Sequence, residues 1–142
     1  MKRLFLTLVC VFFASTAVRA VSDGEVAAHR TALDIAGAFT NDGFKLRDGN
    51  WSSSFEPGKA KIIQVNLYAG NQYWFTLGAT PAAKKVLVTV YDETGKLVKS
   101  DPFQDTSVAA AGFSPDNSGI FFLKVEIVEG AAADFCLVYS YK

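Results

Sequence analysis

The chain has 142 residues, of which 14 are basic and 14 are acidic, and half of its residues are hydrophobic. A balanced charge of this kind provides no basic surface for nucleic acid, and the length suits one domain with a real core. We therefore expect a globular domain and no nucleic-acid partner.

Residues 1–20 have the pattern of a secretory signal peptide. Lys2 and Arg3 precede an apolar run over residues 4–14, and residues 18–20 (Val-Arg-Ala) predict cleavage after Ala20. The run is shorter than the roughly 20 residues that a membrane-spanning helix needs. Cleavage would leave residues 21–142 with a net charge of −3. The segment predicts an exported protein, periplasmic or extracellular, that does not insert into a membrane after the signal is removed.

The mature chain would keep one cysteine, Cys136, because Cys10 lies in the signal peptide. An intrachain disulfide is then impossible despite the oxidising destination. Cys136 lies between Phe135 and Leu137, which favours a small buried hydrophobic residue.

The segment over residues 21–58 contains the only helix that the sequence predicts, Ser22–Phe39. Ser22 and Glu25 fit a capping box, and small and apolar residues repeat along one face. This helix could lie across a sheet or extend as an arm. Residues 43–55 then predict one or two short edge strands around an Asp48-Gly49-Asn50 turn.

Residues 59–142 predict a β-sandwich that forms one domain with the preceding segment. Apolar residues alternate strictly over Ile63–Leu67, Tyr73–Leu77 and Val86–Val90. A period of two indicates strands with one buried face, so Val88 should be buried and Thr89 should face outward. Gly70 and Asn71 predict a hairpin turn between the first two runs.

Further strands are expected to the end of the chain. The expected segments are Lys96–Ser100, residues 109–113, Phe121–Ile127 and Phe135–Tyr141, with Asp101–Asp105 as a connection. About eight short strands with regular turns predict an all-β, jelly-roll-like antiparallel sandwich.

The order of these signals resembles the bacterial pre-peptidase C-terminal domain. The resemblance covers Lys59–Lys142 and rests on residues 69–73 (AGNQY), residues 88–92 (VTVYD) with Gly95, Phe113-Ser114-Pro115 and residues 118–125 (SGIFFLKV). It implies a secreted jelly roll that helps secretion or binds polymers, and some members hold calcium. Only the extension over residues 22–55 accompanies the match here, so we expect no attached enzyme, and Lys84 and Lys85 occupy positions where many members have acidic residues.

The sequence contains no set of residues that indicates catalysis. His29 is the only histidine, and it lies in the expected helix, outside the sandwich. No nucleophile elbow, phosphate loop or His/Cys metal spacing is present, so we expect a non-catalytic protein.

Calcium is the one cofactor that the sequence leaves open. The turn acids Asp92, Asp101, Asp105 and Asp116 could converge at one end of a sandwich and offer hard oxygen ligands. Ordinary turn acids explain the same pattern, because Asp favours local hydrogen bonds in turns.

An aromatic binding face is the remaining hypothesis for a site. If Ile63–Leu67 pairs with Tyr73–Leu77, then Asn66 lies opposite Trp74, Gln64 opposite Thr76 and Tyr68 opposite Gln72. Trp74, Asn66, Tyr68 and Gln64 would then bind a sugar ring or a protein partner. Alternatively, the N-terminal segment covers Trp74.

These observations favour an exported binding or scaffolding module whose partner is an unknown protein or a polysaccharide. The alternative is a structural subunit that docks on a partner through its N-terminal arm. A calcium-binding or carbohydrate-binding module is a narrower version of the first hypothesis.

Overall fold

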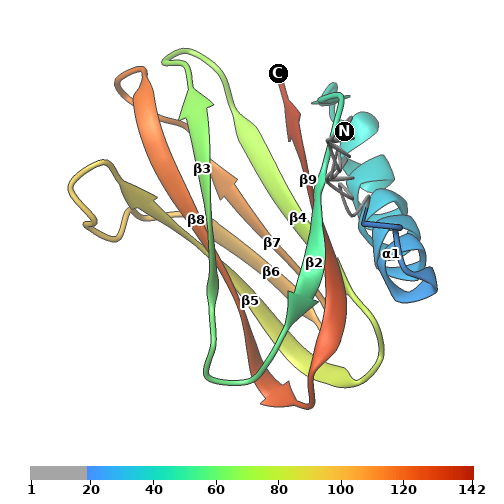
Figure 1. Cartoon of the computed structure of the whole chain (residues 1–142). Coiled ribbons are helices and arrows are strands. Elements are labelled where there is room, and N and C mark those ends of the chain that lie inside the picture. The colour runs from blue at the N-terminus through green and yellow to red at the C-terminus, as the bar shows by residue number, and fades with distance from the viewer. Residues whose placement is uncertain (1–18) are drawn as a thin grey trace, which may run out of the picture.

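The computed structural model describes residues 19–142, which form a two-sheet antiparallel β-sandwich with one helix against its larger sheet (Figure 1). The predicted signal peptide therefore lies almost wholly outside the described residues. Within residues 19–142, no helix is long and apolar enough to cross a membrane. The all-β sandwich with a short N-terminal helix is confirmed.

Nine strands follow helix α1 along the chain. The elements are α1 (Asp23–Thr40), β1 (Lys45–Leu46), β2 (Trp51–Phe55), β3 (Lys61–Leu67), β4 (Tyr73–Ala79), β5 (Ala83–Asp92), β6 (Asp101–Asp105), β7 (Val108–Phe113), β8 (Gly119–Gly130) and β9 (Ala133–Tyr141). The larger sheet has the order β1-β9-β4-β7-β6, with β2 also paired to β9, and the smaller sheet has the order β3-β8-β5.

The core lies between the two sheets and contains the alternating residues that the sequence predicted. Val86, Val88 and Val90 of β5 are buried, and Thr89 lies on the opposite, partly exposed face. They pack with inward residues of β4 and β9 such as Phe75 and Leu137. Both face assignments for β5 are thus confirmed.

The predicted hairpin between the first two runs is wrong. β3 pairs with β8, whereas β4 lies between β7 and β9 in the other sheet. The segment over residues 68–72 therefore crosses from one sheet to the other, with Gly70 at φ +88°. The physical reason is that β4 is buried on both of its faces. If β4 paired with β3 as a hairpin over a solvated face, one of its faces would remain exposed to solvent.

The expected strand at Lys96–Ser100 is also wrong. Only Leu97 makes an isolated bridge, to Tyr91, and the strand forms one segment later as β6. Leu97 is 58% exposed, so two apolar residues did not suffice to recruit this segment into a sheet. Pro102 is accommodated because β6 is an edge strand.

Helix α1 lies across the larger sheet and does not extend as an arm. Ala28, Ala32 and Ala36 are buried against Cys136 and Val138 of β9, which also confirms the buried cysteine. The close approach requires Gly78 in β4, because a Cβ there would lie 2.5 Å from the Ala28 carbonyl oxygen and the Ala32 nitrogen.

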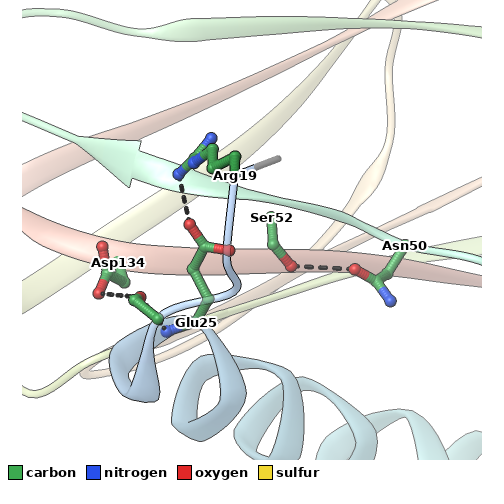
Figure 2. Close-up of polar contacts among 6 residues, drawn as sticks. Arg19, Glu25, Asn50, Ser52 and Asp134 are labelled. Carbon is green, nitrogen blue, oxygen red and sulfur yellow. Dashed lines mark hydrogen bonds and ion pairs between the residues drawn. The ribbon is translucent and has the colours of Figure 1, made fainter. Parts of the chain in front are cut away.

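Polar contacts hold the N-terminal end of α1 to the sheet (Figure 2). The Ser22 hydroxyl accepts from the Glu25 amide at 3.1 Å and donates to Asp134 of β9 at 3.1 Å. The Glu25 carboxylate is almost fully buried and pairs with Arg19, which the predicted cleavage after Ala20 would remove. The Ser22 half of the predicted capping box is confirmed by this bond, while the Glu25 side chain takes an ion-pair partner.

Candidate functional site

The four predicted site residues do not form one surface. Trp74 belongs to β4, and its ring stacks on Phe39 of α1 with 4.4 Å between centroids and 5° between planes. Gly112 of β7 lies directly beside the indole, where a Cβ would come within 3.0 Å of the ring. Trp74 is therefore packed between the helix and the sheet, and the register that placed it opposite Asn66 is wrong.

The other three predicted residues do lie together, in a cleft on the open side of the sandwich. Gln64, Asn66 and Tyr68 come from β3 and the turn that follows it, and they line the gap between the two sheets together with residues of β2, β4, β9 and the loop between β1 and β2. In Figure 1, β3 and β2 are the strands nearest the viewer on this side. We call this feature the aromatic cleft.

Two adjoining cavities of about 290 and 320 Å³ make up the aromatic cleft. They share Arg47, Asn66, Tyr68 and Tyr139, so these residues lie at its centre. Tyr73, Asn71 and Tyr141 line one cavity only, and Trp51, Gln64 and Val65 line the other. Cavities of this size lie at the lower end of the range of small-molecule sites.

Arg47 is held over two stacked aromatic rings. The Trp51 and Tyr139 rings lie 5.9 Å apart at 17°. The guanidinium carbon of Arg47 lies 5.0 Å from the Tyr139 centroid and 5.7 Å from the Trp51 centroid, within cation–π range. The Arg47 amide also donates to the Tyr139 carbonyl at 3.0 Å, which fixes the loop between β1 and β2. The position of the Arg47 side chain is therefore fixed by these contacts, although the side chain is exposed to solvent.

The buried Tyr73 side chain lines the cavity of about 290 Å³. Its hydroxyl accepts from the Tyr68 amide at 2.9 Å and from the Asn71 side chain at 3.1 Å. A phenol also carries one proton to donate, and these two bonds leave that proton free. The same two bonds fix the crossing segment, so that Tyr68, which is 62% exposed, projects at the mouth of the cleft.

Burial raises the pKa of the Tyr139 phenol, and the nearby Arg47 charge opposes this effect in part. The phenol is thus neutral at physiological pH and acts as a ring surface and hydrogen-bonding group. The cleft therefore combines aromatic surface with amide, hydroxyl and guanidinium groups, which suits binding of a small polar ring or chain.

The predicted calcium ligands do not converge. Asp92 and Asp116 line one groove near the end of β5, whereas Asp101 and Asp105 lie at opposite ends of β6. Asp92 accepts from the Thr94 amide and hydroxyl and from the Lys96 amide, and these bonds lower its pKa. Among residues 19–142, no group of three or more potential metal ligands occurs.

Seven of the ten residues that line the aromatic cleft were not predicted as site residues from the sequence. They are Arg47, Trp51, Val65, Asn71, Tyr73, Tyr139 and Tyr141. Trp51 and the alternating tyrosines of the last strand were visible signals, but nothing local indicated which face of which sheet would hold them. His29 lies on α1 and does not line the cleft.

Comparisons with known proteins provide no information about the aromatic cleft. No protein-family model matches the chain, and no curated protein matches it as a relative.

Proposed function

We propose that this protein is an exported, non-catalytic binding module that takes its ligand in the aromatic cleft. The observation that carries the proposal is Arg47, which is held over the Trp51 and Tyr139 rings at the centre of the cleft. An ordered cation beside aromatic rings and side-chain amides is an arrangement that orients a ligand. Export is proposed from the sequence of residues 1–20.

A role in docking through the N-terminal helix receives less support. The Ala face of α1 is already packed on the larger sheet, and Phe39 is stacked on Trp74. The resemblance to pre-peptidase C-terminal domains is retained as a proposal, because it rests on the order of the strand and turn motifs.

A glycan and peptide array with the mature protein tests the proposal. A ligand found on the array should be lost in Tyr68→Ala, because Tyr68 is exposed at the mouth of the cleft. Phe103→Ala is the matched control, since Phe103 is an exposed aromatic residue on β6 at the far edge of the larger sheet. Binding that survives Tyr68→Ala, or the lack of any ligand, would contradict the proposed site.

The non-catalytic part of the proposal has its own test. Turnover of glycosides, esters or peptides by the purified protein, with loss of activity in a variant of the cleft, would show that the module is an enzyme.

A further inference from the structure

The residues that line the aromatic cleft carry a positive charge and no negative charge. Its ten lining residues include one ionised side chain at neutral pH, Arg47, and no aspartate or glutamate. Arg47 takes part in none of the four ion pairs found among residues 19–142. The cleft of a chain with a balanced overall charge therefore carries a local positive charge without a carboxylate partner.

The guanidinium has hydrogen-bond donors to spare. Of its five N–H donors, one bond is formed within the protein, from Nη1 to the Asp48 carbonyl at 3.3 Å. A carboxylate is the group that a guanidinium binds best, through two parallel hydrogen bonds. Stacking over Trp51 and Tyr139 restricts the side chain before a ligand arrives, which lowers the entropic cost of binding.

The remaining groups of the cleft suit a ring that bears hydroxyls. Gln64, Asn66 and Asn71 offer amides that both donate and accept, and the free proton of the buried Tyr73 hydroxyl is available to an acceptor in the cleft. Tyr68 and Tyr141 are partly exposed aromatic rings at the same site. Sugar rings present hydroxyls at their edges and C–H groups on their faces, which match amides and aromatic rings respectively.

From these features we propose that the aromatic cleft binds an acidic saccharide of the uronic-acid class, with the sugar carboxylate on Arg47. The inference deepens the proposed function and rests on it. The side-chain amides would take the sugar hydroxyls, and Tyr68 and Tyr141 would cover the ring. A peptide is the competing class of ligand, because the outer edge of β3 is not paired in its sheet and could accept a strand.

The probe is tetragalacturonate, and its fully methyl-esterified form is the matched neutral ligand with the same rings and hydroxyls. Isothermal titration of the mature protein should show that the free acid binds at least about tenfold more tightly than the ester, because the ester removes a charge-assisted hydrogen bond. Added salt should weaken binding of the acid more than binding of the ester.

Variants of Arg47 test the assigned contact. In Arg47→Gln the preference for the acid should disappear, and in Arg47→Lys part of it should remain, because lysine keeps the charge but not the paired donors. Arg30→Gln, which removes an exposed arginine of α1 outside the cleft, should behave as the wild type. Unchanged thermal unfolding of each variant would show that the fold is retained.

The possible binding results test different parts of the proposal. Equal affinities for the acid and the ester would overturn the role of charge and leave the cleft as a site for neutral saccharides. Binding of neither form, or tighter binding of a peptide with a free C-terminal carboxylate, would overturn the assignment to acidic saccharides. The proposed function fails separately, if the array gives no ligand that depends on Tyr68.

Discussion

Gly78 permits α1 to lie on the larger sheet, and Gly78→Ala should therefore destabilise the protein. The added Cβ would lie 2.5 Å from the Ala28 oxygen and the Ala32 nitrogen and 3.1 Å from the Ala32 Cα. These are backbone atoms of a helix and cannot move singly, so the whole helix would have to move outward. Overpacking of this kind costs about 1–3 kcal/mol, whereas alanine gains at most about 1 kcal/mol by restricting the unfolded chain.

We expect the cost to dominate, with a net loss of about 1–2 kcal/mol in the free energy of unfolding. Urea unfolding followed by tryptophan fluorescence measures it, and Trp74, which stacks under Phe39, should report the displaced helix in the native baseline. Gly119→Ala is the control, because a Cβ there meets nothing within 4 Å and the backbone φ is not positive. A Gly78→Ala protein as stable as the wild type would refute the account of how α1 packs.

Four further substitutions probe the core, the helix interface and the thiol. Val88→Asp should cost several kcal/mol because it buries an unpaired carboxylate, and Thr89→Asp should cost much less; equal losses of stability in urea would mean that the faces of β5 are misassigned. Trp74→Ala should cost about 2–3 kcal/mol, since the side chain is half-buried and stacked, and should leave ligand binding in the cleft unchanged in a titration. Burial raises the pKa of the Cys136 thiol, so its share of the stability is present below the ordinary thiol pKa of about 8.5 and declines as the pH rises above it. Cys136→Ala should reduce this alkaline loss, and a thiol reagent at neutral pH should label the native wild type only as fast as it unfolds.

Local patterns in the sequence were enough for the fold class and for most strands. The alternation in β5 and β8 depends on neighbouring residues alone, so the buried face of each strand followed directly from the period of two. The Ser22 cap and the start of α1 were predictable for the same reason, because a capping hydrogen bond spans three residues.

Strand partners and the helix position depended on contacts between distant segments. The runs at β3 and β4 are adjacent in the chain and both alternate, and that pattern fits a hairpin as well as a crossing between two sheets. The crossing is stabilised because β4 then buries its second face under α1, where Gly78 admits the helix backbone. Nothing within a few residues of β4 carries that information.

The residues of the aromatic cleft were likewise predictable only in part from local sequence patterns. By itself, the sequence determined that Gln64, Asn66 and Tyr68 belong to one strand and the turn after it, and these three do share the cleft. Tertiary structure alone decided that Trp74 packs against helix α1 and does not line the cleft. It also decided that Arg47, Trp51 and Tyr139 line the cleft. The physical reason is that the cleft forms between the edges of two sheets, so its composition depends on which strands become edges, and that depends on long-range pairing rather than on local pattern.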